Sequence, residues 1–307
     1  MSTADGLGLA GTLAGLEDER QAALKKSKQQ TTFVLTATAL FTVALFLTKY
    51  IFLGIVVLIG GLIATLIIRG VLLGRVRTDF KRKIMPVLLR GIDPSLQYDP
   101  ARYVGEKEFN QSNLFQNPDR YSGKDLMEGK IGATAVRFSL IHAEEKYQET
   151  ETDSDGKTST HTEYRTIFSG LFFVADFNKH FSARTKVEPH SFTFLEKLFG
   201  SHVELESPEF NKLFAVSSTD QVEARYILTP SLMDHFMALR AKIGEFKAAF
   251  ADEHVFMALN VPYNAFEPSL KQPLTESGQV EKILFKLNTI TGIVEDLGLN
   301  MRIWTKE

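Results

Sequence analysis

The sequence contains no cysteine and a single tryptophan among its 307 residues. The absence of cysteine excludes thiol catalysis, zinc sites with thiolate ligands, iron–sulfur clusters and disulfide bonds. Otherwise the composition is that of a folded chain, because 44% of the residues are hydrophobic and 23% are charged, which excludes a disordered or collagen-like protein. A chain of this length suits one sizeable domain with additional elements, or two small domains.

Charge is almost absent from one stretch near the N-terminus. Between positions 31 and 68 the only charged residue is Lys49. Residues 31–48 and 51–68 would each form a helix of roughly 27 Å, close to the ~30 Å thickness of a bilayer's hydrocarbon core. A single continuous span would bury Lys49 at mid-bilayer at a cost of about 2.5 kcal/mol or more. The sequence therefore predicts a transmembrane hairpin that turns at Lys49-Tyr50.

Basic residues flank this apolar stretch on both sides, whereas the predicted turn carries only Lys49. They are Arg20, Lys25, Lys26 and Lys28 before it, and Arg69, Arg75, Arg77, Lys81, Arg82 and Lys83 after it. Because cytoplasmic segments are enriched in Lys and Arg, we expect both termini to face the cytoplasm. A secretory signal is disfavoured, since the apolar segment is too long and no small-x-small cleavage site precedes Lys49.

Small residues within and next to the predicted spans have spacings that allow close helix packing. They are Thr38 and Thr42 on the first span, Gly60 and Ala64 on the second, and Gly70 and Gly74 at the membrane edge. Two interpretations stay open, packing of the two helices on each other and contact between copies of the chain. Neither span holds an acidic residue or histidine, which disfavours an ion relay and makes a channel subunit the weakest reading.

A basic segment follows the second span. Residues 69–93 contain seven Lys or Arg and two Asp, whereas residues 94–307 have a net charge of −8. Apolar residues recur every four positions, at Val76, Phe80, Ile84 and Leu88, so a basic juxtamembrane helix is expected over 69–94. Its candidate lipid-facing cations are Arg75, Arg77, Lys81, Arg82 and Lys83. The acidic remainder makes nucleic acid an improbable partner.

The regions on either side of this membrane-proximal part are expected to differ in order and fold. Residues 1–30 are expected to be a cytoplasmic lead, flexible over 1–16 and helical over 17–30. Residues 95–307 are expected to form a cytoplasmic α+β domain with a mostly antiparallel sheet and flanking helices.

Alternating apolar residues predict a strand over 131–147. A second strand over 164–177 would return to form a long hairpin whose polar tip turns at Asp155-Gly156. A shorter hairpin is expected from 246–250 and 254–261. Four phenylalanines of the strand over 164–177 are expected to fill the core rather than bind a ligand. They are Phe168, Phe172, Phe173 and Phe177.

Helices are expected over 191–198, 208–213, 220–226, 230–241 and 276–297. Thr229 is the expected N-cap of the fourth of these helices, with Pro230 at its first position. Asp220 is the expected cap of the third, and an ion network between Asp220 and Arg225 is also expected.

The motifs that usually carry chemistry are missing. His142, His161 and His202 each precede a glutamate by two positions, but no HExxH occurs and no second cluster closes a metal site. The run at 153–156 starts like a calcium loop, yet its glycine stands at the fourth position rather than the sixth. Since P-loop and GxSxG patterns are also absent, we predict no catalytic, cofactor-binding or metal-binding residue.

Three stretches carry a family resemblance: DLMEGKIGATAVR at 125–137, FSGLFFVADFNKHFSARTKVEP at 168–189, and LESPEFNKLFAVSSTDQVEARYILTPSL at 205–232. They resemble the domain-of-unknown-function 3137 family of bacterial membrane proteins, over about residues 20–300. The resemblance implies a bacterial inner membrane location and a LemA-type membrane protein as a partner. The family has no established activity, so no catalytic residue is carried over. The polar insertion at 148–162 is longer than the family pattern implies.

Taken with the resemblance, these features predict a membrane-anchored cytoplasmic scaffold or interaction module of a bacterial inner-membrane assembly. Its expected partners are the lipid bilayer, further copies of itself and a LemA-type protein. The alternative is a membrane-bound hydrolase or ligand-binding sensor whose site is built from non-adjacent residues, because such sites need no local motif.

Overall fold

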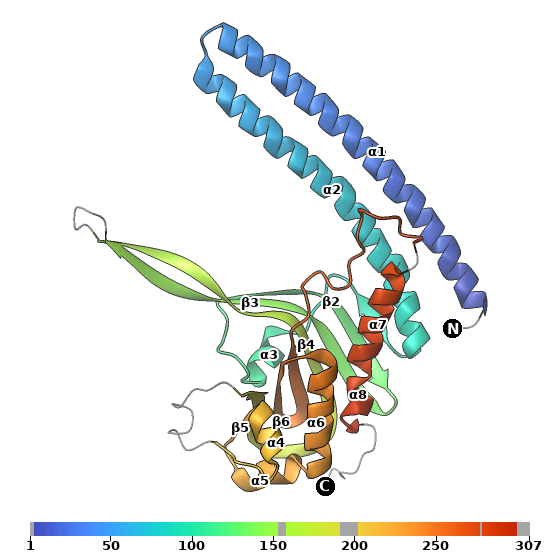
Figure 1. Ribbon diagram of the computed structural model, residues 1–307, viewed down its shortest axis with the longest axis vertical. Coiled ribbons are helices and arrows are strands. Elements are labelled where there is room, and N and C mark those ends of the chain that lie inside the picture. Colours follow the sequence, from blue (N-terminus) through green and yellow to red (C-terminus); the bar gives the residue numbers. More distant parts are fainter. Residues whose placement is uncertain (1–2, 153–157, 191–201, 277, 300–307) are drawn as a thin grey trace. The chain divides into compact units, whose positions relative to one another are not determined.

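The computed structural model describes residues 3–152, 158–190, 202–276 and 278–299 (Figure 1). The chain divides into two compact units. Unit 1 consists of Met1–Leu88 with Phe266–Ile283, and unit 2 of Leu89–Ala265 with Leu284–Glu307. The expected α+β class is confirmed, since two long apolar helices precede an antiparallel sheet with flanking helices.

Unit 1 contains a helical hairpin formed by α1 (Thr3–Leu47) and the greater part of α2 (Ile51–Ile92). The turn falls where the sequence predicts it. Lys49 adopts a left-handed conformation with φ 65°, and the Tyr50 N–H donates to the carbonyl of Leu45 at 2.9 Å. This is the usual way to end a helix with a residue in the left-handed region, although glycine is the commoner choice there.

Two expectations for the ends of these helices have different outcomes. The prediction that residues 1–16 form a flexible lead is wrong, because α1 is helical from Thr3 and Leu16 is fully buried. The leucines and alanines of this segment favour a helix enough to offset its glycines. The apolar stripe of α2 is confirmed. Its members, Val76, Phe80, Ile84 and Leu88, are all buried, and the helix continues through Pro86 to Ile92.

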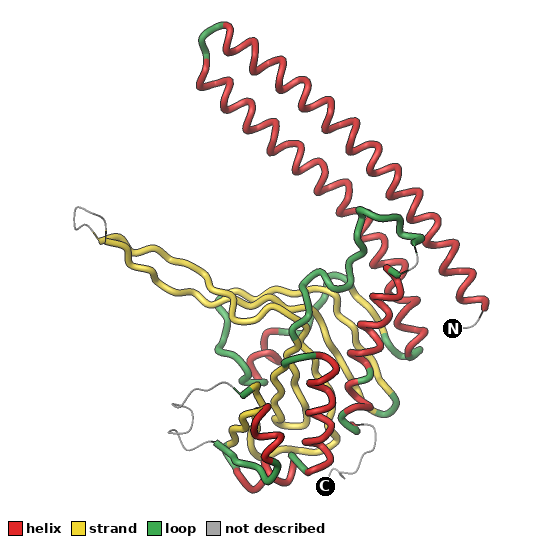
Figure 2. The backbone as a smooth tube through the Cα atoms, viewed as in Figure 1, coloured by secondary structure: helices red, strands yellow, loops and turns green. Residues whose placement is uncertain are grey.

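Unit 2 is built on a six-stranded sheet in which every pairing is antiparallel. Its strands are yellow in Figure 2. The strands are β1 (Gln97–Asp99), β2 (Arg120–Ile131), β3 (Thr134–Thr152), β4 (Thr158–Pro189), β5 (Phe214–Ser218) and β6 (Phe246–Leu259). They are ordered β1-β2-β3-β4-β5, and β6 pairs with the other edge of β4. The predicted long hairpin is β3–β4, and its tip at 153–157 lies outside the described residues.

The predicted hairpin at 246–250 and 254–261 is wrong. The chain does not reverse at residues 251–253 but continues as the single strand β6 along β4. Asp252 adopts φ 55° and is paired with Phe181, where the register of β4 and β6 shifts on both sides. A polar residue in the left-handed region thus makes a bulge here, although the same local signal is typical of a turn.

Strand β2 was not predicted as a strand. Two glycines and alternating charges weaken its apolar pattern, and it carries its own irregularity between Lys124 and Met127. The buried Asp125, with φ 62°, lies within that irregularity and accepts a hydrogen bond from the Tyr98 hydroxyl.

Short helices flank the sheet: α3 (Glu106–Gln111), α4 (Pro208–Leu213), α5 (Gln221–Ile227), α6 (Pro230–Ile243), α7 (Gln279–Thr291) and α8 (Ile293–Asp296). The caps at Thr229 and Asp220 are confirmed, since each side chain accepts a hydrogen bond from a backbone N–H of the first turn. The helix expected over 276–297 is divided at Gly292. The helix expected over 191–198 lies outside the described residues.

The Asp220–Arg225 ion network is not what these side chains form. Asp220 Oδ1 accepts from the backbone N–H groups of Val222 and Glu223 at 2.7 and 3.2 Å. The Arg225 guanidinium donates to the backbone carbonyl of Glu204 at 3.3 Å. Both side chains therefore form hydrogen bonds with backbone groups and not with each other.

The phenylalanines form the core of unit 2, as predicted. Phe172 and Phe173 point to opposite faces of β4, and both have no exposed surface. Phe172 packs near Phe109 of α3 and Phe256 of β6, with ring centroids 5.1 and 6.2 Å apart.

Candidate functional site

The hairpin exposes large apolar side chains along much of its length. Of the 25 exposed large hydrophobic residues among those the structure describes, 20 lie between Phe33 and Val71, and Phe52 and Leu47 are about four-fifths exposed. The two helices are also long and apolar enough to cross a membrane, by length and composition. A water-soluble protein rarely leaves so much contiguous apolar surface uncovered. The apolar helices therefore indicate an association with a membrane.

The two predicted threonines of the first span lie in the seam between the helices. A Cβ built on Gly61 of α2 would lie 2.2 Å from Thr38 Oγ1, so the two backbones approach closely only because residue 61 is glycine. Thr42 is 6% exposed. The expected small-residue packing thus occurs within the hairpin at these positions.

The predicted glycines, by contrast, lie outside the seam. Gly60, Gly70 and Gly74 have open space where a side chain would extend, and Ala64 is half-buried. The residues that the sequence analysis missed are Gly61 and Gly54, the latter against the Phe46 ring. Their seven-residue spacing was the available signal, because residues seven apart return to the same helix face.

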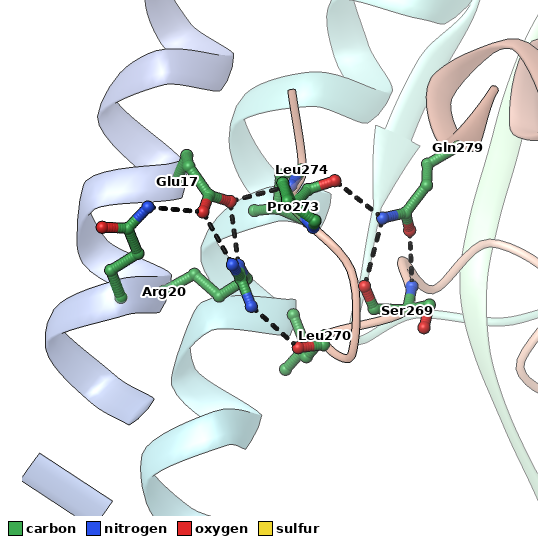
Figure 3. Close-up of polar contacts among 8 residues, drawn as sticks. Glu17, Arg20, Ser269, Leu270, Pro273, Leu274 and Gln279 are labelled. Carbon is green, nitrogen blue, oxygen red and sulfur yellow. Dashed lines mark hydrogen bonds and ion pairs between the residues drawn. The ribbon is translucent and has the colours of Figure 1, made fainter. Parts of the chain in front are cut away.

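A segment from far along the chain packs on the polar base of the hairpin, which comprises residues 3–30 of α1 and 69–88 of α2. This segment, Phe266–Ile283, belongs to unit 1. Arg20 of α1 donates from Nη1 to the carbonyl of Leu270 at 3.0 Å. The Leu274 N–H donates to Glu17 Oε2 at 2.8 Å (Figure 3). We call these contacts, with those of Glu267 described below, the base clasp.

Glu17 and Arg20 form a bidentate ion pair at the centre of the base clasp. Arg20 Nε and Nη2 lie 2.8 and 2.7 Å from the two carboxylate oxygens of Glu17, and both side chains are 9% exposed. A third donor, the amide of Gln21, lies 2.9 Å from Glu17 Oε1. Breaking a buried pair leaves an uncompensated charge, so each partner depends on the other.

The electrostatics of this pair are strongly perturbed. The hydrogen bonds from Arg20, followed by those from Gln21 and the Leu274 N–H, outweigh the effect of burial and lower the pKa of Glu17 from 4.5 to about 2. The same pairing raises the pKa of Arg20. Both groups therefore stay charged throughout the physiological range, and the base clasp holds as a fixed structural contact rather than a proton-transfer site.

A glutamine gives the bound segment its shape. Gln279 Oε1 accepts from the Ser269 N–H at 2.7 Å, while its amide nitrogen donates to the carbonyls of Ser269 and Pro273 at 3.2 and 3.0 Å (Figure 3). One side chain thus closes the loop that presents the Leu270 carbonyl and the Leu274 N–H to α1.

The predicted lipid-facing cations divide into two groups. Arg77 and Lys81 lie 3.9 and 3.4 Å from the carboxylate of Glu267, and Lys83 lies 2.8 Å from Glu19 of α1. Lys81 is also buried. Only Arg75 and Arg82 are exposed without an ion pair to a described residue. Sequence reasoning could not separate the groups, because Glu267 lies 186 residues from Lys81.

Unit 2 has a small hollow of about 290 Å³ on its sheet, between β2, β3, β4 and β6, lined by both apolar and charged residues. Glu128, Arg137, Asp176 and His254 line it, and the Nδ1 atom of His254 is buried with no hydrogen-bond partner among the described residues. Three or more His, Cys, Asp or Glu residues suited to hold a metal ion do not come together anywhere in the described ranges.

The three His–Glu pairs of the sequence do not converge. His142 Nε2 lies 3.4 Å from Glu144 of its own strand, whereas His161 Nε2 lies 3.2 Å from the Ser159 hydroxyl. His202 makes an isolated bridge to Ser217.

Comparison with known proteins supports the family resemblance over part of the chain. The model of the family described as Protein of unknown function (DUF3137) matches residues 166–299. The matched residues belong to unit 2 and to the segment Phe266–Ile283 of unit 1. The match does not include the apolar hairpin.

Other comparisons add no functional information. No curated protein matches the chain significantly. The crystal structure of the mycobacterial trehalose monomycolate transport factor A, TtfA, aligns with 75% of this chain and 97% of its own. The TM-score is 0.37 and the sequence identity 12%, values too low to support a conclusion about this chain.

Proposed function

We propose that this protein is a membrane-anchored scaffold of the bacterial inner membrane. In this proposal residues 31–48 and 51–68 span the bilayer, both termini face the cytoplasm, residues 69–94 form the juxtamembrane helix, and residues 95–307 act as the interaction domain. The single observation that supports it most is the run of exposed apolar side chains between Phe33 and Val71, which is flanked by basic residues.

Tethering is the mechanism that such an arrangement offers. A domain fixed to the bilayer meets membrane-bound partners at a higher effective concentration than a free domain does. The expected partners are further copies of this chain, through the outward face of α2 that carries Gly60, and a LemA-type membrane protein. Purification in native nanodiscs, followed by mass photometry and mass spectrometry, tests both. A monomer with no protein partner would contradict the scaffold.

The topology can be tested directly because the chain has no native cysteine. Tyr50→Cys places a thiol at the exposed hairpin turn, and Lys26→Cys places one at the exposed base of α1. In intact spheroplasts a membrane-impermeant maleimide should label the first variant, and should label the second only after permeabilisation. Labelling of both without permeabilisation would contradict a spanning hairpin, and the reverse pattern would contradict the orientation.

A ligand-binding sensor is the second candidate, and the hollow on the sheet favours it. Its lining includes two carboxylates, a guanidinium and an imidazole whose Nδ1 has no hydrogen-bond partner among the described residues. Such convergent polar groups are typical of sites that orient a small ligand. Native mass spectrometry of the purified protein should then show a stoichiometric small molecule, which His254→Ala should release. Identical spectra for the two proteins would remove this candidate.

A further inference from the structure

Five exposed cations lie at the base of the hairpin, immediately next to the apolar stretch. They are Lys25, Lys26 and Lys28 on α1 and Arg69 and Arg75 on α2. None of them forms an ion pair or hydrogen bond with a side chain that the structure describes. The hairpin places them at similar heights along its long axis, since α1 and α2 are antiparallel and contact each other between Thr38 and Gly61.

Their distance from the predicted spans can be estimated from the helical rise of about 1.5 Å per residue. Arg69 and Lys28 lie within roughly 5 Å of the span ends, and the farthest, Arg75, at about 10 Å. Lysine and arginine side chains reach several ångströms further along an apolar surface. All five therefore come within about one Debye length, ~8 Å at physiological salt, of a membrane surface at the span ends.

The cations farther from the predicted spans differ both in their distance from the membrane surface and in their ion pairing. Lys81 and Lys83 lie about 20 Å below the span end, more than two Debye lengths away. They are also paired, with Glu267 and Glu19. Their charge is thus compensated within unit 1, where Lys81 contacts segment 266–283 and Lys83 links α2 to α1.

The five cations nearest the predicted spans are not compensated in this way. The sequence contains no aspartate or glutamate between positions 20 and 78. The nearest acidic residues on the two helices are Glu19, six positions before Lys25, and Asp79, one helical turn beyond Arg75 on the side away from the spans, and neither forms an ion pair with the five cations. A group of cations beside an apolar surface, with acidic residues only on its far side, attracts anionic groups that themselves lie at an apolar boundary. Phospholipid headgroups have both properties.

We propose that Lys25, Lys26, Lys28, Arg69 and Arg75 bind the headgroups of anionic phospholipids in the leaflet next to the hairpin base. This inference rests on the proposed membrane anchoring. It replaces the lipid-facing set expected from the sequence, of which only Arg75 remains. The two groups of cations then have separate roles, the five near the spans in lipid selection and those farther away in ion pairs within unit 1.

The test uses the full chain reconstituted in nanodiscs of phosphatidylcholine with a minority of phosphatidylglycerol. The lipids retained with the protein after mild delipidation are quantified by mass spectrometry. Wild type should enrich phosphatidylglycerol over the bulk ratio by about fivefold, the factor that one cation near an anionic surface contributes at roughly 1 kcal/mol. The enrichment should decrease at high salt.

The variant in which all five cations are replaced by glutamine should retain the two lipids in their bulk ratio. Arg82→Gln is the matched control, because Arg82 is basic, exposed and about 21 Å below the span end. It should keep the wild-type enrichment. Equal enrichment in the five-residue variant and wild type would overturn the lipid site while leaving the anchor intact. A wild-type chain that does not enter these nanodiscs would overturn the anchor as well.

Discussion

At the residue scale, the carboxylate of Glu17 holds together parts of the chain that are far apart in sequence. It accepts hydrogen bonds from Arg20, Gln21 and the Leu274 N–H, and Arg20 in turn reaches the Leu270 carbonyl. Removing the Glu17 carboxylate would leave a buried guanidinium without its counter-charge, which is the costly way to change a buried ion pair.

Glu17→Ala should therefore weaken the attachment of segment 266–283 to α1 by about 3 kcal/mol. The Leu274 amide reports this directly, because it donates to Glu17. Its hydrogen exchange should accelerate by roughly a hundredfold. Glu19→Gln is the control, since the Glu19–Lys83 pair is about 45% exposed and contributes about 1 kcal/mol or less. Unchanged exchange of Leu274 in Glu17→Ala would contradict the importance of the pair.

The same carboxylate predicts a pH dependence. The pKa of Glu17 is about 2 in the folded chain and 4.5 when the group is free, so its contribution is complete above pH 4.5 and is lost as the pH falls towards 2. The protection factor of the Leu274 amide should decrease across this window in the wild type. In Glu17→Gln it should be low already and nearly independent of pH there. A parallel decrease in both proteins would assign the effect to other carboxyl groups.

At the element scale, the seam and the outer face of α2 place neighbouring glycines in opposite surroundings. Gly61 faces Thr38, whereas Gly60 has open space. Making the same substitution at each of these two glycines therefore separates the two interpretations of the small residues, hairpin packing and contact between copies.

Gly61→Leu should destabilise the hairpin by about 1–3 kcal/mol or prevent its packing, because a side chain there collides with Thr38. Gly60→Leu should leave the hairpin intact. If copies associate through this face, it should also reduce crosslinked oligomers in native membranes. Thermal stability of the purified variants and crosslinking yield are the two measurements. Unchanged crosslinks in Gly60→Leu would contradict association through Gly60, and equal stability of both variants would contradict the seam.

Elements that depend on local signals were predictable from the sequence, and elements that depend on distant partners were not. The Thr229 and Asp220 caps and the turn at Lys49 follow from residues within a few positions of each other. Strand β6 was mistaken for a hairpin because a bulge and a turn use the same residue types. Only the neighbouring strand β4 determines that the chain continues straight.

At the scale of the whole molecule, each of the two units combines segments that are far apart in the sequence. Unit 1 takes its hairpin from the N-terminal part and its bound segment from residues 266–283. Hydropathy located the hairpin, because a long uncharged run is a local property. It could not reveal the base clasp, because Glu17 and Leu274 are 257 residues apart and neither stands in a recognisable motif.

Excision of residues 31–68, with a short Gly-Ser linker between Gln30 and Arg69, tests whether the apolar stretch alone accounts for membrane association. Helices in contact lie about 8–10 Å apart, which such a linker can bridge. The shortened chain should appear in the soluble fraction and retain slow exchange of the Leu274 amide. A soluble chain that loses this protection would show that the base clasp needs the apolar hairpin. Persistent membrane binding would identify a second anchor.

The 250 residues between Arg20 and Leu270 also have a consequence for biosynthesis. At 5–20 residues per second, the ribosome needs roughly 10 to 50 s to make the partner of Arg20 after Arg20 itself has emerged. Throughout that interval the base of α1 lacks its contacts with segment 266–283. A chain that terminates early, before residue 266, can never form them. The base clasp is therefore complete only in chains synthesised past residue 274, and in shorter chains Glu17 and Arg20 lack their backbone partners at Leu274 and Leu270.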